Sequence, residues 1–440
     1  MPDLAVVGGG PGGTAAALTA ARTGAQVTLI ERANLGGVCV HAGCIPAGAF
    51  HRTISVHDQA RSAERVGVAG CEPHVDFARM HAWVGDVVNE AAARTRMALE
   101  FAGVEVISGA ARFTGPGQLE AGGRSFEGVA VVLATGARSE VGGLPGAPAR
   151  VLTNDEAMAL AEPPASLAVL GAQRFSLEWA DFFHALGSQV TLVTSESRIL
   201  PGEDAELAEF LQMMLEERGV RFLLGAKLER IDGTIVLAGD DKIETDAVLM
   251  ADHRVPNVGD LGLDAGGVVL APDGGIAVDE TCKTSVDVVW AVGDVTGPPW
   301  LSNRASAMGA VAARNALGEK TKLRPERIPR SVNTHPELAA VGFTVDEARA
   351  KGIQAESLLA DLAANLRAVT LAEERGALKL VVDTEFGEIV GAHMVGPGAS
   401  EVIAQVVTAM ELEADYRDLA KVAHIHPSLA ELVTLAAGSG

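Results

Sequence analysis

Cysteine is scarce in this chain, because 440 residues contain only four. In a reducing compartment, a close pair of cysteines is more often catalytic or metal-binding than a structural crosslink. Cys39 and Cys44 form such a pair, five positions apart in the stretch GGVCVHAGCIPAGAF. Cys71 and Cys282 have no obvious partner in the sequence, and we interpret them as structural. The scarcity therefore directs attention to one pair.

Basic charge and long apolar runs are also lacking. The chain has 35 Lys and Arg residues against 57 Asp and Glu, and its net charge of −22 repels the phosphates of nucleic acids and anionic lipids. No apolar run reaches the roughly 20 residues of a membrane-spanning helix. The N-terminal MPDLAVVGGGPGG lacks the basic region and cleavage site of a signal peptide. We expect no nucleic-acid partner, no membrane partner and a cytoplasmic location.

The length and composition are those of a folded multidomain protein. Hydrophobic residues make up 48% and charged residues 21% of the chain, as in ordinary globular proteins. At roughly 150 residues per domain, the length predicts about three domains.

A glycine-rich turn lies between two apolar stretches at the start of the chain. Gly8, Gly10 and Gly13 form a complete GxGxxG motif, followed by an alanine-rich helical pattern and a second apolar stretch that ends in Glu31. This order predicts a strand, a helix and a strand. Such glycines allow a pyrophosphate to approach the helix N-terminus, and the acid accepts hydrogen bonds from ribose. We expect a dinucleotide site here.

A similar outline returns later, which predicts a second nucleotide-type fold. Its expected elements are a strand at 167–170, a helix that ends near 186 and a strand at 189–194. We expect a further helix at about 87–101. Two prolines and a charge cluster near 325 predict a linker into a C-terminal α+β domain.

The spacing of Cys39 and Cys44 does not by itself decide their chemistry. Residues five apart in a regular helix are about 7.5 Å apart along the axis, beyond the roughly 7 Å limit for disulfide Cα atoms. Gly43 and Pro46 allow an irregular turn in which the thiols meet. A redox pair and two inert thiols therefore stay open. Zinc is disfavoured, since no second cysteine pair or close histidine cluster completes a ligand set.

Near the end of the chain, VAHIHPSLAELV contains His426 and Glu431. A histidine oriented by a carboxylate can exchange a proton with a thiol. In isolation, a histidine at a helix entry beside a surface glutamate is the simpler interpretation.

Taken together, these stretches resemble the flavoprotein disulfide reductase family, and most closely its dihydrolipoamide dehydrogenase and mercuric reductase branches. GGVCVHAGCIP resembles the family's redox-disulfide helix, VVLATGARS and AVGDVTG its further flavin motifs, VNTHPELAAVGFT the start of its dimerisation domain, and HIHPSLAE its closing acid/base motif. The resemblance runs nearly end to end.

The resemblance implies roles for ten residues and a dimeric enzyme. FAD would be held by Gly8, Gly10, Gly13, Glu31, Gly136 and Asp294. Cys39 would exchange with a lipoyl-type dithiol, which can be protein-bound, and Cys44 would contact the flavin. His426, paired with Glu431, would serve as acid/base toward the cysteines of the other subunit, so a homodimer is expected.

The fold class implied is α/β, with two Rossmann-like nucleotide-binding domains, of FAD and NAD(P) type, and a C-terminal α+β dimerisation domain. The expected boundaries are an FAD-binding domain at 1–142 and 259–325, an NAD(P)-type domain at 143–258 and a dimerisation domain at 326–440. No metal site is expected.

The sequence departs from the family on the nucleotide side. The second loop keeps only the first glycine of GxGxxG, Gln173 stands where the second would be, and the following strand ends in Thr194 rather than an acid. Gly48 stands where the family has a lysine that pairs with a glutamate, whose position matches Glu178. Arg174 and Arg198 are candidates for a phosphate contact. Weak NAD(P) binding and a different electron carrier both stay open.

Three alternatives accompany this prediction. A mercuric reductase-like enzyme and another NADPH-dependent disulfide reductase are the enzymatic ones, although the chain's end, ELVTLAAGSG, has no cysteine pair to pass on a metal. A non-catalytic flavoprotein redox sensor is the third, and the intact set of thiols and base opposes it. The sequence does not identify the dithiol, the carrier, the direction of reaction, the effect of Gly48 or the role of His41.

Overall fold

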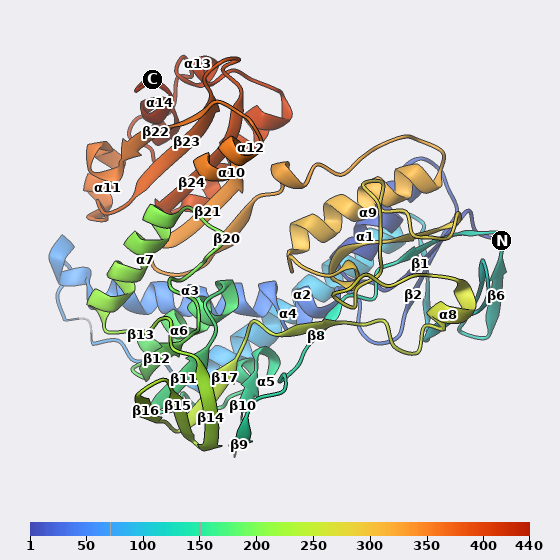
Figure 1. The fold of residues 1–440 in the computed structure, drawn as a ribbon, viewed down its shortest axis with the longest axis horizontal. Coiled ribbons are helices and arrows are strands. Elements are labelled where there is room, and N and C mark those ends of the chain that lie inside the picture. The colour runs from blue at the N-terminus through green and yellow to red at the C-terminus, as the bar shows by residue number, and fades with distance from the viewer. Residues whose placement is uncertain (71, 149–150) are drawn as a thin grey trace. The chain divides into compact units, whose positions relative to one another are not determined.

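The computed structural model describes residues 1–70, 72–148 and 151–440, in two compact units. Unit 1 comprises Met1–Glu140, Asn154–Glu162 and His253–Arg324; unit 2 comprises Val141–Thr153, Pro163–Asp252 and Pro325–Gly440. Figure 1 traces both from the N-terminus to the C-terminus. Cys71 lies outside the described residues, so its structural role stays a prediction.

Unit 1 is built on a parallel sheet in the order β19-β7-β1-β2-β3. The strands are β1 (Leu4–Val7), β2 (Val27–Glu31), β3 (Glu105–Ser108), β7 (Ala130–Leu133) and β19 (Val289–Ala291). β1 is buried along its whole length, as expected for a strand covered on both faces. Leu4 and Val6 share a core with helical residues, whereas Ala5 and Val7 share one with a small antiparallel sheet.

Those two covering layers explain the apolar strand sequence. α1 (Pro11–Arg22) and α9 (Ser302–Ala316) lie side by side on one face, which Figure 1 shows. On the other face are β4 (Ala111–Gly115), β5 (Gln118–Ala121) and β6 (Arg124–Glu127).

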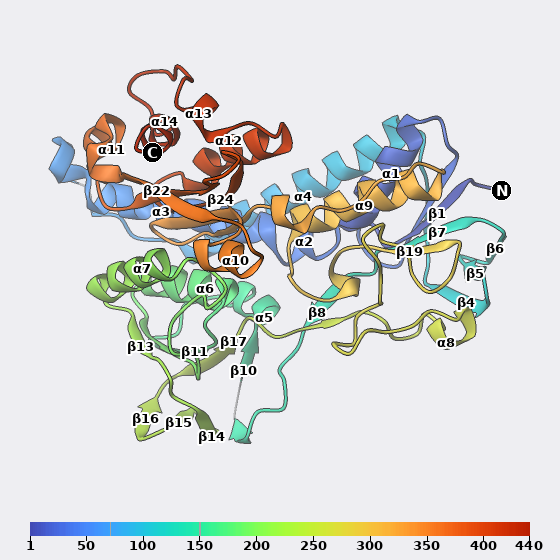
Figure 2. The ribbon, with the colours of Figure 1, turned by 45° about the horizontal axis from the view of Figure 1, so that its top comes forward.

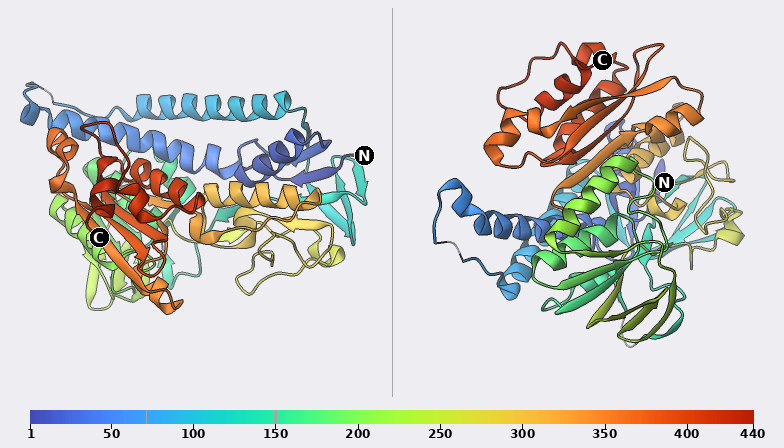
Figure 3. Two further views of the ribbon diagram at one scale, coloured as in Figure 1. Left: turned by 90° about the horizontal axis from the view of Figure 1, so that it is seen from above. Right: turned by 60° about the vertical axis from the view of Figure 1, so that its left-hand side comes forward.

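α4 (Phe77–Phe101) corrects the helix expected at about 87–101. It begins earlier because the side chain of Asp76 accepts a hydrogen bond from the backbone N–H of Arg79 at 3.1 Å and so caps the helix. Figure 3 shows the length of α4 beside α3 (Cys44–Arg61). The remaining elements of unit 1 are α2 (Gly37–His41), η1 (Ala63–Val66), β8 (Ala137–Ser139), α5 (Asn154–Met158), β18 (Arg254–Pro256), α8 (Leu263–Gly266) and η2 (Gly293–Thr296).

The central part of unit 2 repeats the parallel architecture, in the order β10-β17-β11-β12-β13. Its strands are β10 (Val151–Thr153), β11 (Ser166–Leu170), β12 (Gln189–Val193), β13 (Arg221–Leu223) and β17 (Ala247–Met250), with the helices α6 (Arg174–Ala185) and α7 (Ala205–Arg218). A second sheet contains β9 (Gly146–Pro148), β14 (Leu228–Gly233), β15 (Ile235–Ala238) and β16 (Asp241–Glu244). Figure 2 shows this part in green, with α6 and α7 on the side of the sheet away from β14 to β16.

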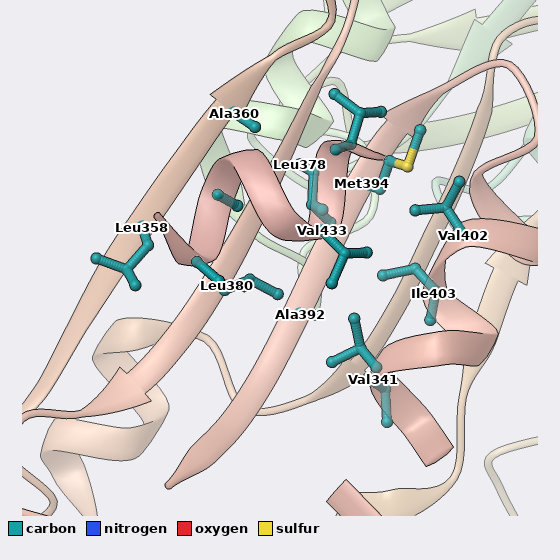
Figure 4. Packing of buried hydrophobic residues seen from close by; sticks show 14 of the residues in the cluster. Val341, Leu358, Ala360, Leu378, Leu380, Ala392, Met394, Val402, Ile403 and Val433 are labelled. Carbon is teal, nitrogen blue, oxygen red and sulfur yellow. The ribbon is translucent and has the colours of Figure 1, made fainter. Parts of the chain in front are cut away.

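The C-terminal part of unit 2 is an antiparallel sheet covered by helices, in the order β20-β21-β24-β23-β22. Its strands are β20 (Arg330–Val332), β21 (Glu337–Gly342), β22 (Ala355–Asp361), β23 (Ala377–Asp383) and β24 (Ile389–Gly396). Its helices are η3 (Pro325–Arg327), α10 (Val345–Ala350), η4 (Leu362–Ala364), α11 (Leu366–Leu371), α12 (Ala399–Glu411), α13 (Tyr416–Leu419) and α14 (Glu431–Ala437). Leu380 and Met394 of the sheet point toward Ile403 of α12 and Val433 of α14 in Figure 4.

These elements confirm the predicted fold class of two Rossmann-like folds and a C-terminal α+β domain. They also confirm both predicted strand-helix-strand units, to within a few residues. In the described part of the chain, no helix is long and apolar enough to cross a membrane.

Candidate active site

The glycines of the first loop serve packing as well as ligand approach. Gly8 has φ +104°, and a Cβ there would lie 2.3 Å from the carbonyl oxygen of Ala134. A Cβ on Gly13 would lie 1.8 Å from the carbonyl oxygen of Gly8. At Gly10, by contrast, the nearest atom to an added Cβ is the Cα of Gly37, at 4.0 Å. Gly10 therefore leaves open space at the start of α1, where a pyrophosphate would approach.

The other predicted cofactor residues follow neighbouring strands of the same parallel sheet. Glu31 ends β2 and accepts hydrogen bonds from the backbone N–H of Gly9 at 2.6 Å and of Ala33 at 2.8 Å. Gly136 follows β7, with φ +70° and no neighbouring atom within 4 Å of an added Cβ. Asp294 lies in η2, directly after β19. Because these strands are parallel, their carboxyl ends share one edge of the sheet, and the residues there fit FAD.

Cys39 and Cys44 lie on two consecutive helices rather than on one. α2 ends at His41 and α3 begins at Cys44, with an irregular backbone at Gly43 between them. A Cβ on Gly43 would lie 2.9 Å from the carbonyl oxygen of Val38, so the break requires glycine. Both cysteines are thiols, and their side chains are hydrogen-bonded to each other. The break in the helix therefore brings the two sulfur atoms together.

A serine from a distant part of the chain joins the two thiols. The Oγ of Ser302, the first residue of α9, lies 3.0 Å from the Sγ of Cys44. The hydrogen bond to Cys44, and then burial, raise the pKa of the Cys39 thiol far above its ordinary value, while the Ser302 hydroxyl lowers it. Cys44 is itself the first residue of α3, where the helix dipole favours negative charge. Cys39 therefore holds its proton more tightly than an ordinary thiol does.

His41 and Gly48, which the sequence left open, and Cys282, which we interpreted as structural, now have defined surroundings. The Nε2–H of His41 donates to the carbonyl oxygen of Leu35 at 2.9 Å. Cys282 is buried, and burial raises the pKa of its thiol to about 12, which agrees with a structural role. Gly48 is exposed in α3, and an added Cβ would meet no atom within 4 Å. Glycine at position 48 is therefore not required by packing.

The predicted acid/base pair is formed within unit 2. The Nδ1 of His426 lies 2.9 Å from Oε1 of Glu431, and the backbone N–H of Ser428 donates to Oε2 at 2.9 Å. The Ser428 N–H, and then His426, lower the pKa of the Glu431 carboxyl. The side chain of His426 is 62% exposed. Since Nδ1–H donates to the carboxylate, Nε2 is the ring nitrogen that can accept a proton from a thiol.

Glu178, which matches the glutamate that pairs with the missing lysine, has other partners in unit 2. Its Oε1 accepts hydrogen bonds from the backbone N–H of Asn333 at 2.9 Å and from Nδ2 of the same residue at 3.2 Å. Burial raises the pKa of Glu178, and the charge of Arg174 and the Asn333 contacts oppose this. An asparagine therefore stabilises this buried carboxyl.

Comparison with known proteins gives two family matches, which follow one another along the chain. Residues 2–316 match the family model described as pyridine nucleotide-disulphide oxidoreductase, and residues 328–437 match the dimerisation domain of that group. The chain belongs to the pyridine nucleotide-disulphide oxidoreductase family. The resemblance stated from the sequence motifs is thereby confirmed.

Relatives cover the whole length of this family member. It is 37% identical to a dihydrolipoyl dehydrogenase of Thermus scotoductus, over 98% of this chain and 95% of the relative. It is 35% identical to a dihydrolipoyl dehydrogenase of Halobacterium salinarum, over 99% and 95%. Among solved structures, LpdA of Mycobacterium tuberculosis superposes with a TM-score of 0.91 at 30% identity, over 99% of both chains. The HOCl-induced flavoprotein disulfide reductase RclA of Escherichia coli has a TM-score of 0.86 at 28% identity, again over 99% of both.

These matches identify an FAD-dependent disulfide oxidoreductase that resembles dihydrolipoyl dehydrogenase and carries the family's dimerisation domain. The sequence did not single out Ser302 at the cysteine pair or Asn333 at Glu178. The contacts of these two residues join positions separated by 258 and 155 residues, so no local pattern reveals them.

Proposed function

We propose that this oxidoreductase acts on a lipoyl-type dithiol through Cys39 and Cys44. The observation that carries the proposal is the contact between the two thiols across the break between α2 and α3. A pair that meets only because Gly43 interrupts a helix is suited to opening and closing a disulfide. The full-length likeness to dihydrolipoyl dehydrogenases supports a lipoyl group as the substrate.

The proposed exchange begins with the Cys39–Cys44 disulfide and a substrate dithiol. A substrate thiolate attacks Cys39, and Cys44 leaves as a thiolate. The second substrate thiolate then attacks the substrate sulfur that is bonded to Cys39. The bond between the substrate and Cys39 breaks, and Cys39 leaves as a thiolate. The substrate becomes a disulfide and the protein pair becomes two thiols, with two electrons transferred. The contacts observed between Cys39 and Cys44 are those of this reduced pair.

Protons require a base near the outer thiol, and we assign that role to His426. Its Nε2 would take a proton from the substrate thiol, while Glu431 holds Nδ1–H and stabilises the imidazolium. By the family resemblance, His426 and Glu431 of one protomer serve the cysteine pair of its partner. A homodimer is then a condition of activity.

FAD, when bound, supplies a two-electron acceptor for the dithiol pair. We propose that Gly8, Gly10 and Gly13 admit its pyrophosphate at the start of α1. Glu31 would turn from Gly9 and Ala33 toward the ribose hydroxyls, with Gly136 and Asp294 at the same edge of the sheet. Cys44 would be the thiol that faces the flavin.

Anaerobic titration of the flavin-loaded protein with dihydrolipoamide tests the proposal. We expect one equivalent to reduce the pair or the flavin, followed as flavin absorbance. Cys39→Ser and Cys44→Ser should each abolish the response. A wild-type protein whose flavin spectrum and thiol count do not change with excess dihydrolipoamide contradicts a lipoyl-type substrate.

Cys282→Ala is the matched control, because it removes a buried thiol and leaves the pair intact. It should titrate as the wild type does. The cytoplasmic location expected from the sequence stays a prediction, which cell fractionation tests.

A further inference from the structure

The second nucleotide-type fold has the same plan as the first at its ligand-binding edge. β11 leads through Gly171 into α6, as β1 leads through Gly8 into α1. In dinucleotide-binding folds, the pyrophosphate lies against the N–H groups at the start of this helix. The contacts of these N–H groups in unit 2 therefore decide whether a pyridine dinucleotide fits.

A carboxylate of the chain itself lies at the start of α6. Oδ2 of Asp252 accepts hydrogen bonds from the backbone N–H of Gln173 at 3.1 Å and from Oγ of Ser176 at 2.5 Å. Oδ1 accepts one from the backbone N–H of Ser176 at 3.2 Å, and the N–H of Phe175 donates to the same carboxylate. One internal anion thus uses the donors that a pyrophosphate would use.

The turn is shaped around this carboxylate. Gly171 has φ +133°, and a Cβ there would lie 2.5 Å from Oδ2 of Asp252 and 2.4 Å from Oγ of Ser176. Withdrawal from water raises the pKa of Asp252, while the Ser176, Gln173 and Phe175 donors oppose this. Four donors on one carboxylate offset part of the cost of its desolvation. The Asp252 carboxylate is therefore held in place by hydrogen bonds, rather than being an exposed side chain.

Unit 1 provides the comparison within the same chain. Leu133 of β7 pairs with Val7 of β1, as Met250 of β17 pairs with Leu170 of β11. Two residues after these partners lie Thr135 in unit 1 and Asp252 in unit 2. The hydroxyl of Thr135 donates to the carbonyl oxygen of Asn257. The two folds therefore differ at this position. The FAD-type fold has the neutral residue Thr135, whereas the NAD(P)-type fold has the acidic residue Asp252.

The groups that would select the ribose are also engaged elsewhere. Thr194, at the place that Glu31 has in unit 1, is buried, and its Oγ1 accepts a hydrogen bond from the backbone N–H of Glu196 at 3.1 Å. The guanidinium of Arg198 donates to the carbonyl oxygens of four residues, at 2.6 to 3.3 Å: Ile199, Leu200, Pro201 and Glu203. Arg198 is thus a structural residue of its own loop rather than a contact for the 2′-phosphate of NADPH.

We infer that the second nucleotide-type fold excludes pyridine dinucleotides, because the Asp252 carboxylate occupies the place of the pyrophosphate at the start of α6. NAD(P) does not fit the residues present. The inference goes beyond the proposed function: it concerns unit 2 alone and does not depend on the dithiol chemistry assigned to unit 1. A protein that fails to react with dihydrolipoamide can still exclude NAD(P). A protein that binds NAD(P) can still react with dihydrolipoamide.

Calorimetric titration of the flavin-loaded wild-type protein with NADH and with NADPH is the first test. We expect no saturation below about 1 mM, the weak end of the usual range for enzyme substrates. Saturation by either nucleotide at micromolar concentration overturns the inference.

Two variants test the cause. Asp252→Asn keeps the size of the side chain and removes its charge, and we expect NADH to bind about tenfold more tightly. The double variant Gln173→Gly, Asp252→Thr places a glycine in the loop and, at position 252, the threonine that unit 1 has at Thr135. We expect its affinity for NADH to be about 100-fold higher than that of the wild type. Thermal unfolding checks that both variants are folded. If both are folded and neither binds NADH better than the wild type, Asp252 is not the cause of the exclusion of NADH.

The matched control is Asp240→Asn, which removes an exposed carboxylate between β15 and β16. It should bind NADH no better than the wild type, and an equal gain in this control would refute a specific role of Asp252. Hydrogen exchange adds a readout without nucleotide. The amides of Gln173, Phe175 and Ser176 should exchange about tenfold faster when Asp252 is threonine, and unchanged exchange would contradict the contact.

Discussion

Replacing Ser302 with alanine should slow the reaction of the cysteine pair with an alkylating reagent. The hydroxyl lies 3.0 Å from Sγ of Cys44 and also lowers the pKa of Cys39. A hydrogen bond to a charged group contributes about 1.5–3 kcal/mol. Because one hydroxyl serves two sulfur atoms and Cys44 is exposed, the lower end, about 1.5 kcal/mol, applies. This corresponds to about tenfold less thiolate at neutral pH.

The assay is the rate of iodoacetamide alkylation of the reduced protein, with the peptides that contain Cys39 and Cys44 quantified by mass spectrometry. Ser302→Ala should react about tenfold more slowly at neutral pH. Its rate should also reach the plateau at higher pH than the wild type. Ser302→Thr retains a hydroxyl and should restore most of the rate.

Ser306→Ala is the control, since Oγ of Ser306 donates to the carbonyl oxygen of Ser302 at 3.1 Å and leaves the Ser302 hydroxyl in place. Its alkylation profile should match that of the wild type. If Ser302→Ala reacts as fast as the wild type across the pH range, the hydroxyl does not stabilise the thiolate and the reasoning is wrong.

Three further outcomes follow from other contacts. Gly48→Lys should raise the free energy of unfolding by about 0.5–1 kcal/mol, because the site is open and glycine is a poor helix former; a lower melting temperature for this variant and for Gly48→Ala would contradict the open site. His426→Gln should slow flavin reduction by dihydrolipoamide about 100-fold in stopped flow, as expected for loss of a general base; an unchanged rate removes His426 from the mechanism. Burial lowers the pKa of His393, so below about pH 6.5 the unfolded chain binds a proton that the folded chain does not, and stability should fall as the pH falls. His393→Gln can still donate to the carbonyl oxygen of Phe343, and its melting temperature should depend less on pH in this range; an equal dependence assigns the effect to other groups.

Much of the fold was readable from local patterns. The apolar run Leu4–Val7 next to a glycine turn already predicted a strand and the helix that follows it. The structure shows that this strand is buried along its whole length, because both of its faces are covered. The start of α4 was missed because its cap, Asp76, lies before the stretch whose composition was most helical. Local signals therefore predicted the existence of elements better than their ends.

The sequence by itself determined the family, the cysteine pair and the partnership of His426 with Glu431, because each depends on residues close together in the chain or on motifs in a fixed order. The tertiary structure decided what surrounds them. Gly43 and Pro46 allowed an irregular turn, but only the fold brought Ser302 to Cys44 across 258 positions. The weakened loop at Gln173 left NAD(P) open, and only the pairing of β11 with β17 carried Asp252 to the start of α6. Hydrogen bonds act over about 3 Å in space, whatever the separation in sequence, so contacts of this kind appear only when the chain has folded.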